Sequence, residues 1–281
     1  MKKSPTAEII SVGNELLIGH TLDTNSHWIA KRFTRFGWTL QRITVLRDSL
    51  ASIKDGVAGA LQRRPDLLIT LGGLGPTYDD MTLKGIAFAL DKRLALNPEA
   101  LAMVKARYSR LEASTGLTRF RKKMATLPEG AKPLPNPIGT APGVMIKVGT
   151  TKLVSLPGVP SEMKAIFAGS VIPMLRAPAS EAPKEVQIGL VGIIESALAP
   201  ALDRTRKAFP GLYFKSHPRG REGGIRTLIQ LHVYSVDPDS RAKLDDAVAY
   251  PFANYRPRSI PPRKQETPLK KALEPKLFLF S

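Results

Sequence analysis

The chain has 281 residues, of which 43% are hydrophobic and 23% are charged, and it contains no cysteine. This composition is typical of a globular protein with one large domain or two smaller ones. It excludes disulfides, thiolate catalysis and cysteine-ligated zinc. The formal net charge of +18 favours anionic partners. Because the basic residues are scattered and no aromatic residues interleave them, we do not expect nucleic acid to be the main partner.

The sequence shows no sign of membrane insertion or export. No apolar run approaches the ~20 residues that a membrane span needs. The N-terminus has two lysines but only a short apolar run, so it does not resemble a signal peptide. We therefore expect no membrane association and a cytoplasmic location, with which the lack of cysteine agrees.

Strand and helix patterns alternate through the first 90 residues. Continuous apolar runs predict buried strands at 7–13 and 67–71, and a further strand is predicted between them at 38–46. Helical spacing follows each run, and the three expected helices end near residues 36, 64 and 90. The residues Asp23, Thr24 and Asn25 can cap the first helix, and Asp48 can cap the second. The alternation predicts a mostly parallel sheet with helices on both faces.

The regular alternation of strands and helices is not continued in residues 97–175. Residues 97–126 form one or two charged helices with a basic cluster of Arg119, Arg121, Lys122 and Lys123. That cluster is either a solvated helix face or a lid whose cations meet ligand phosphates. A loop rich in Pro and Gly covers 127–143. Strands at 144–148 and 151–157 then pair across a turn, and a helix capped by Ser161 runs to about Leu175.

A second, smaller domain follows the segment 177–185, which has the composition of a linker. Strand and helix patterns in the order βαββα predict a small α+β domain with an antiparallel sheet at 185–250. The expected elements are strands at 185–193, 211–217 and 225–234 and helices at 195–208 and 238–249. The last 31 residues hold seven Lys or Arg, two Asp or Glu and six Pro, which predicts disorder over 251–281. This tail is either a functional basic arm or the product of a frameshift.

The stretch 66–80, DLLITLGGLGPTYDD, carries the most chemistry. A buried strand, a glycine turn and a helix start are what an open α/β sheet uses to hold a phosphate-bearing ligand. The N–H groups of Gly72, Gly73 and Gly75 can approach a phosphate without hindrance from a side chain. The adjacent carboxylates of Asp79 and Asp80 would repel that ligand unless a cation lies between them. We expect Asp80 to bind metal or ligand and Asp79 to start the helix.

Other loops at strand ends can converge on the same crevice. They offer hydroxyl and amide groups for a ligand and hard oxygen ligands or a base for a divalent cation. These are Asn25, Thr77, Thr140 and Ser161 for the ligand, and Glu15, Asp23, Asp48, Asp79 and Asp80 for the cation. Each signal has a plain alternative: the glycines can form a tight turn, and Glu15 and Asp48 can be N-caps.

Four motifs in this order resemble one family. They are SVGNELLIGHTLDTNSHWIAKRF, ITLGGLGPTYDDMT, LPEGAKPLPNPIGTAPG and LPGVPSEM. They are similar to the amino-terminal domain of competence/damage-inducible protein A, the CinA family, a relative of the MogA and MoaB proteins. The resemblance covers about 7–176 in its motifs and assigns residues 1–176 to this domain.

The resemblance implies a three-layer α/β domain, a homo-oligomer and a nucleotide or pterin nucleotide as ligand. By motif position, Asp48 and Asp80 match the two functional aspartates of MogA-like proteins. The anion-binding loop is matched by Gly72, Gly73, Gly75, Pro76 and Thr77. In CinA-type proteins this domain is associated with metal-dependent ADP-ribose pyrophosphatase activity, so the implied cofactor is Co²⁺, Mg²⁺ or Mn²⁺, with K⁺ as a further candidate. Full-length relatives often add a deamidase domain, which we do not expect here after residue 250.

The leading hypothesis is therefore a metal-dependent pyrophosphatase that hydrolyses ADP-ribose or a related dinucleotide with water. The diphosphate would lie on Gly72–Thr77, and a divalent ion would bridge it to Asp80, helped by Asp48, Asp23 or Glu15. Lys122 or Arg121 would neutralise charge at the leaving phosphate. The alternatives are a non-hydrolytic binding protein of molybdenum cofactor metabolism, adenylyl transfer to molybdopterin, and a basic nucleic-acid-binding protein.

Overall fold

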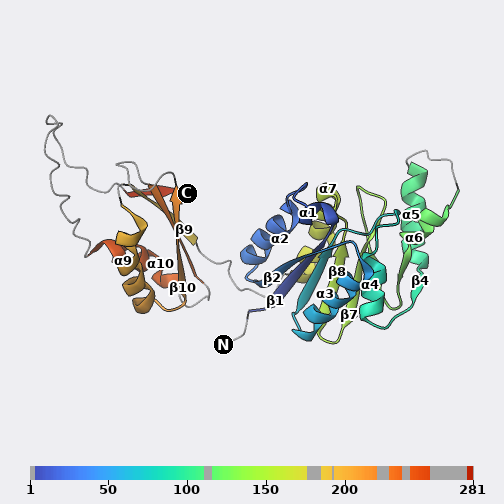
Figure 1. Cartoon of the computed structure of the whole chain (residues 1–281), viewed down its shortest axis with the longest axis horizontal. Helices are drawn as coiled ribbons and strands as arrows, with labels where there is room; N and C mark the ends of the chain where they lie inside the picture. The colour runs from blue at the N-terminus through green and yellow to red at the C-terminus, as the bar shows by residue number, and fades with distance from the viewer. Residues whose placement is uncertain are drawn as a thin grey trace. The chain divides into compact units, whose positions relative to one another are not determined.

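The computed structural model describes residues 4–110, 116–175, 185–191, 193–219, 228–235, 241–253 and 277–280. The chain divides into two compact units, residues 1–180 and 181–281, each with its own hydrophobic core (Figure 1). In the part of the chain that the structure describes, no helix is both long and apolar enough to cross a membrane.

The first unit is built on a six-stranded sheet. In spatial order its strands are β2 (Thr39–Leu46), β1 (Thr6–Val12), β3 (Leu67–Leu71), β8 (Thr151–Leu156), β7 (Gly143–Val148) and β6 (Lys132–Leu134). The four strands from β2 to β8 are mutually parallel, and β7 and β6 each run antiparallel to their neighbour. The predicted open, mostly parallel sheet is therefore confirmed. Its parallel strands end at one edge, and the loops that leave them there can form a common site.

Helices cover both faces of this sheet, as predicted. They are α1 (Asn14–Leu17), α2 (Thr24–Arg35), α3 (Leu50–Gln62), α4 (Thr82–Ala89), α5 (Pro98–Arg110), α6 (Arg119–Lys123), α7 (Pro160–Ile166) and α8 (Ile172–Leu175), with a π-helical turn at Phe167–Val171. Alternate residues of β1 pack to opposite sides. Ile10 belongs to a core with helices α3, α4 and α5, whereas Ile9 belongs to a core with α2, α7 and α8. The three-layer arrangement follows from this alternation.

The helices α5 and α6 form a separate part of the first unit, which we call the α5–α6 arm. Two short antiparallel strands, β4 (Leu94–Leu96) and β5 (Thr126–Pro128), flank it. In Figure 1 the arm lies at the opposite end of the unit from α2. The apolar side of α5 enters the first core through Ala100 and Val104, so the arm is anchored to the sheet layer.

Several predicted details of the first unit are corrected by the structure. The segment 127–143 is not all loop, because β6 and the end of β5 lie in it. The cap of α3 is Ser49, whose side chain accepts a hydrogen bond from the Ser52 N–H, and not Asp48. The cap of α7 is Val159, with Pro160 at the first helical position, and not Ser161. The helix α4 begins at Thr82 behind Met81, so Asp79 does not start it.

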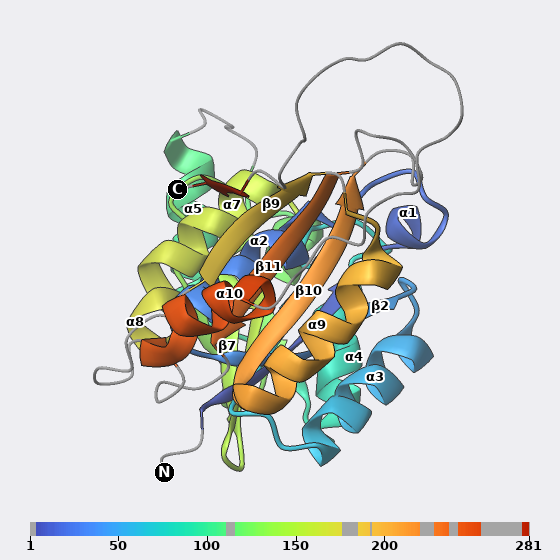
Figure 2. The same cartoon turned by 90° about the vertical axis from the view of Figure 1, so that its left-hand side faces the viewer.

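The second unit has the predicted α+β character. Its sheet contains β10 (Leu212–Arg219), β11 (Leu228–Ser235), β9 (Glu185–Val191) and β12 (Leu277–Phe280) in that order, and all pairs are antiparallel. The helices α9 (Glu195–Ala208) and α10 (Leu244–Ala253), preceded by a 3-10 turn at Arg241–Lys243, pack on one face (Figure 2). The tail was predicted to be disordered, but Ala253 ends a helix and 277–280 form a strand. Residues 254–276 lie outside the described residues.

Candidate functional site

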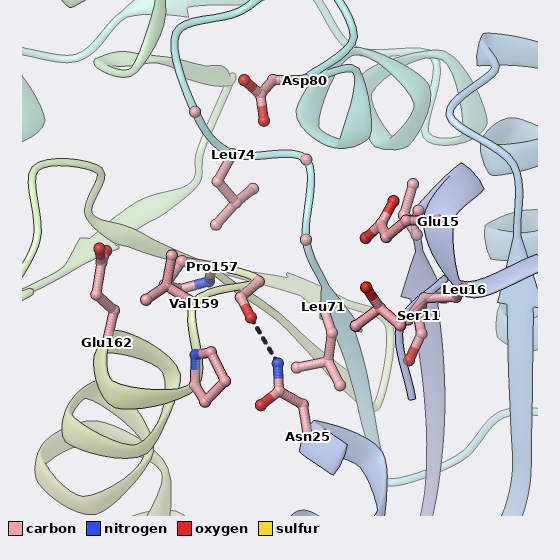
Figure 3. Close-up of a pocket in the computed structure, with 18 of the residues that line it drawn as sticks. Ser11, Glu15, Leu16, Asn25, Leu71, Leu74, Asp80, Pro157, Val159 and Glu162 are labelled. Atoms are coloured by element: carbon pink, nitrogen blue, oxygen red, sulfur yellow. Dashed lines mark hydrogen bonds between the residues drawn. The ribbon is translucent and has the colours of Figure 1, made fainter. Parts of the chain in front are cut away.

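A cavity of about 490 Å³ opens at the carboxyl ends of β1, β3 and β8. Loops that follow each of these strands line it, as expected for an open parallel sheet. The cavity brings together ten of the residues predicted from the sequence: Glu15, Asp23, Asn25, Asp48, Gly72, Gly73, Gly75, Pro76, Asp80 and Thr140. Three predicted residues, Thr77, Lys122 and Ser161, are not among the lining residues. The side chains of Asp80, Glu15 and Glu162 approach the cavity from different sides (Figure 3).

The glycine loop after β3 has a backbone that suits an anion. Gly72 and Gly73 have φ angles of +92° and +68°, a region that side-chain-bearing residues rarely adopt. The N–H of Gly72 donates to the carbonyl of Leu156, so it is used in the sheet and is not available to a ligand, contrary to the prediction. The N–H groups of Gly73, Leu74 and Gly75 have no hydrogen-bond partner within the described residues. Successive free N–H groups of this kind bind anions.

Thr77 brings the two adjacent carboxylates of this loop together. Its hydroxyl lies 2.5 Å from Oδ1 of Asp79 and 2.5 Å from Oδ2 of Asp80, so these two oxygens are at most 5.0 Å apart. The Thr77 N–H also donates to Oδ2 of Asp80 over 2.8 Å. The hydrogen bond from the Thr77 hydroxyl is the main reason why the pKa of Asp79 lies below its ordinary value. Thr77 therefore acts by orienting the carboxylates, although it does not line the cavity.

Lys123 is the basic residue of α6 that reaches this loop. Its Nζ donates to the carbonyl of Thr77. Burial lowers the pKa of the Lys123 ammonium, and the negative charges of Asp80 and Asp79 oppose that shift. The neighbouring Lys122, which we predicted as the catalytic cation, is exposed. The sequence could not separate the two lysines because α6 has only five residues and no apolar stripe that would fix its orientation.

Asp48 and Glu15 lie on the β1 side of the cavity. The Asp48 carboxylate accepts a 2.7 Å hydrogen bond from the N–H of Asn14, the first residue of α1. It therefore satisfies a free N–H at the start of that helix from a distant part of the chain. The Glu15 side chain folds back over Gly13, where a Cβ would meet its carboxylate at 2.4 Å. Both carboxylates remain among the residues that line the cavity.

Asp23 is occupied by structural hydrogen bonds. Its Oδ1 accepts from the Ser26 N–H at 2.9 Å and caps α2, and its Oδ2 accepts from the Ser11 hydroxyl at 2.6 Å. No three Asp, Glu or His side chains of the described residues lie close enough together to hold a metal ion between them. The predicted metal-ligand set of Asp80, Asp23 and Glu15 is therefore not assembled. The physical reason is that both oxygens of Asp23 are engaged, Oδ1 by the cap of α2 and Oδ2 by the Ser11 hydroxyl.

The loop after β8 completes the cavity wall. The Asn25 amide donates to the carbonyl of Gly158 over 2.7 Å, which ties α2 to this loop (Figure 3). The Asn25 Oδ1 atom is buried and has no partner among the described residues, so it can accept a hydrogen bond from a ligand. Thr140 also faces the cavity, whereas Ser161 is exposed in the first turn of α7.

Glu162 is a site residue that the sequence reasoning missed. It lines the cavity and accepts a 2.8 Å hydrogen bond from the amide of Asn136, which also donates to the carbonyl of Ala141. Glu162 thus links α7 to the loop 136–141. The sequence does carry a signal for it, because Glu162 lies in the strand-to-helix turn that follows β8, two residues after Pro160.

The cavity is strongly acidic although the chain is basic. Six carboxylates line it, from Glu15, Asp23, Asp48, Asp79, Asp80 and Glu162. The described residues that line it include no Lys, Arg or His. A ligand in this cavity therefore either carries positive charge or brings a cation with it, because uncompensated like charges repel.

Comparison with known proteins finds a matching family and relatives over most of the chain. The model of a family described as probable molybdopterin binding domain matches residues 8–177. A protein of Aeropyrum pernix is 46% identical over 234 residues, which are 83% of this chain and 86% of that protein. A protein of Pyrobaculum calidifontis is 43% identical over 237 residues, which are 83% of this chain and 88% of that protein.

A solved structure shows the same relationship in three dimensions. The crystal structure of CinA from Thermoplasma acidophilum is 40% identical and aligns with a TM-score of 0.57. The alignment covers 61% of this chain and 98% of that one. The chain therefore belongs to the family of probable molybdopterin binding domains, and it is a CinA-type member of that family, as its four motifs predicted.

Proposed function

We propose that the cavity binds a nucleotide or pterin nucleotide through its diphosphate, and that the chain hydrolyses this diphosphate in ADP-ribose or a similar dinucleotide. One observation carries the proposal. The free N–H groups of Gly73, Leu74 and Gly75 precede two carboxylates whose oxygens are at most 5.0 Å apart. Donors for an anion next to ligands for a cation are what a metal–diphosphate complex requires.

The residues present fit a hard divalent cation such as Mg²⁺, Mn²⁺ or Co²⁺. Carboxylate oxygens are its preferred ligands, and Mg²⁺ is commonly held by one or two carboxylates together with substrate phosphates. Asp79 and Asp80 supply such a pair, which is consistent with the lack of a three-ligand group among the described residues. When bound, the ion would neutralise charge on the phosphates and lower the pKa of a bound water.

Residues of the chain would bind the phosphate, bind the base or pterin, and accept a proton from the attacking water. The free N–H groups would hold one phosphate, and the unpartnered Oδ1 of Asn25 would accept a hydrogen bond from the base or pterin. Asp48, fixed by its bond to Asn14, would accept the proton of the attacking water. Water is the nucleophile in this proposal, because the chain has no cysteine.

The test measures release of AMP from ADP-ribose, FAD and NAD by the purified full chain with Mg²⁺, Mn²⁺, Co²⁺ or chelator. We expect metal-dependent turnover of at least one dinucleotide. Asp80→Asn should lower kcat/KM by about 100-fold or more, because it removes one of the two carboxylate ligands proposed for the cation. Asp48→Asn should lower kcat by a similar factor.

The matched control is Asp55→Asn. This residue is exposed on α3, does not line the cavity, and carries the same charge. We expect it to leave kcat/KM unchanged, which separates a local effect from a change in net charge. Turnover by none of the dinucleotides, or equal turnover by Asp80→Asn and the wild type, would contradict the hydrolytic proposal.

A second candidate is binding without hydrolysis, in molybdenum cofactor metabolism. It is favoured by the description of the matching family as a molybdopterin binding domain. Saturable binding of a pterin nucleotide or ADP-ribose, with no product after long incubation with each metal, would support it over hydrolysis. A cytoplasmic location and a homo-oligomeric state belong to both candidates and remain predictions.

A further inference from the structure

The proposed function requires more positive charge near the bound diphosphate than the acidic cavity itself provides. Two phosphates of a diphosphate would face six carboxylates, and one divalent ion offsets only part of this repulsion. The cavity lining offers no basic side chain among the described residues. Cations that reach the loops of the cavity from outside are therefore the groups to consider.

Two basic residues of the α5–α6 arm reach these loops, and each bonds to a backbone carbonyl. Lys123 of α6 donates to the carbonyl of Thr77, next to the lining residue Pro76. Arg107 of α5 donates to the carbonyl of Ile138, two residues before the lining residue Thr140. The arm therefore bonds through one cation to each of two loops that border the cavity.

A neutral carbonyl is a weak partner for a cation in comparison with a phosphate. A phosphate adds the attraction between opposite charges to the hydrogen bond, and it can accept a bidentate pair of bonds from Arg. Arg107 also has a donor to spare, because its Nε is buried and has no hydrogen-bond partner within the described residues. The Lys123 side chain is half-buried, so its ammonium is only partly solvated where it stands. Both groups would gain from a nearby anion.

We propose that Arg107 and Lys123 exchange these carbonyls for the phosphates of the bound diphosphate, so that the α5–α6 arm supplies the positive charge that the cavity lacks. This inference rests on the proposed function, which it deepens by naming the residues that select a diphosphate. It assigns the role of the cation to Lys123 and Arg107, and not to Lys122 or Arg121. The bonds that change are hydrogen bonds only, and no covalent step is involved.

The test is calorimetric titration of the full chain with ADP-ribose and with adenosine, in the presence of Mg²⁺. Lys123→Gln and Arg107→Gln should each raise the Kd for ADP-ribose by roughly 10-fold or more, which is the loss expected for one charge-assisted hydrogen bond. The Kd for adenosine should not change, because adenosine has no phosphate. Lys123→Arg should keep the Kd for ADP-ribose within a few-fold of the wild type.

Matched controls come from the same arm. Lys105→Gln and Arg110→Gln remove one charge each from exposed positions of α5, and we expect no change in either Kd. The unfolding midpoint of each ligand-free variant is measured as well. If Lys123 only held the loop in place, its removal would lower that midpoint and would weaken adenosine as much as ADP-ribose.

The outcomes separate this inference from the proposed function. Wild-type binding of ADP-ribose that Lys123→Gln and Arg107→Gln leave unchanged would overturn the inference alone. A greater loss for Lys122→Gln than for Lys123→Gln would also overturn it. A wild-type chain that neither binds nor hydrolyses any dinucleotide would overturn the proposed function and this inference with it.

Discussion

The glycine loop shows most directly how single residues shape the site. A Cβ at Gly73 would lie 2.2 Å from the hydroxyl of Thr82, and the residue has a φ of +68°. The Thr82 hydroxyl is fixed there because it donates to the carbonyl of Gly72 over 2.8 Å. Both the backbone angle and the space require glycine. The sequence alone shows the glycines but not which of their N–H groups are free.

Gly73→Ala is therefore expected to destabilise the first unit by about 3 kcal/mol. The left-handed backbone costs about 1–2 kcal/mol for a residue with a side chain, and the overlap with Thr82 adds about 1–3 kcal/mol. Gly19→Ala is the matched control, because Gly19 has a φ of +76° but nothing within 4 Å of its Cβ position. It should cost only about 1–2 kcal/mol.

Urea unfolding followed by tryptophan fluorescence measures this difference. Both tryptophans of the chain, Trp28 and Trp38, belong to the first unit, so the signal reports on that unit. Equal losses for Gly73→Ala and Gly19→Ala would show that the contact with Thr82 adds nothing to the backbone strain.

At the scale of helices and strands, the elements that could be predicted from the sequence are the buried ones. The strands β1 and β3 are covered on both faces, so their sequences are continuous apolar runs with clear ends. The strands β5 and β6 were missed because each has three residues and contains a proline, Pro128 or Pro133. Three residues are too few to show an alternating pattern.

The ends of helices were harder to predict than the helices themselves. A capping side chain competes with other partners that only the folded chain brings near. Asp48 bonds to Asn14, which is 34 positions away, and Ser49 takes the cap of α3. Asp79 bonds to Thr77, and α4 begins without a side-chain cap. The predicted cap at α2 was right, because Asp23 accepts from Ser26 within one turn.

The start of α2 offers a test of the role of Asp23. Asp23→Ala should lower the free energy of unfolding of the first unit by about 1–2 kcal/mol, since it removes an N-cap. Asp23→Asn should stay within about 0.5 kcal/mol of the wild type, because Asn is an equally good cap. The measurement is the same urea titration, in which Trp28 of α2 itself contributes to the signal.

Asp23→Asn also decides whether Asp23 is a metal ligand. If Asp23 serves only as a cap, the metal concentration for half-maximal turnover should be the same for Asp23→Asn and the wild type. A tenfold increase in that concentration for Asp23→Asn, with normal stability, would restore Asp23 to the metal site. Asp80→Asn provides the comparison, because we expect it to increase this concentration.

At the scale of the whole molecule, the net charge did not predict the charge of the cavity, whereas the order of the motifs predicted which loops form it. The net charge of +18 suggested anionic partners in general. The structure instead shows an acidic cavity, and two cations of the α5–α6 arm bond to the loops beside it. Composition could not predict this, because it does not record where in space the charges lie. The order of motifs did predict that the loops after β1, β3 and β8 would meet, since parallel strands place their carboxyl ends at one edge.

The two units should be separable. Each has its own core: the first is built from residues up to Leu175, and the second from residues after Val186. Every residue that lines the cavity lies between Ser11 and Glu162. The fragment 1–180 should therefore fold alone, unfold in urea at the same midpoint as the full chain by tryptophan fluorescence, and bind ADP-ribose within about twofold of the full chain.

The fragment 181–281 serves as the control in the same titration, and we expect it not to bind ADP-ribose. The reason is that none of the cavity residues, and neither Arg107 nor Lys123, belongs to it. A fragment 1–180 that is unfolded, or that binds ADP-ribose tenfold more weakly than the full chain, would contradict the separation. That result would mean that the second unit contributes either stability or binding groups to the first, although its own core is complete.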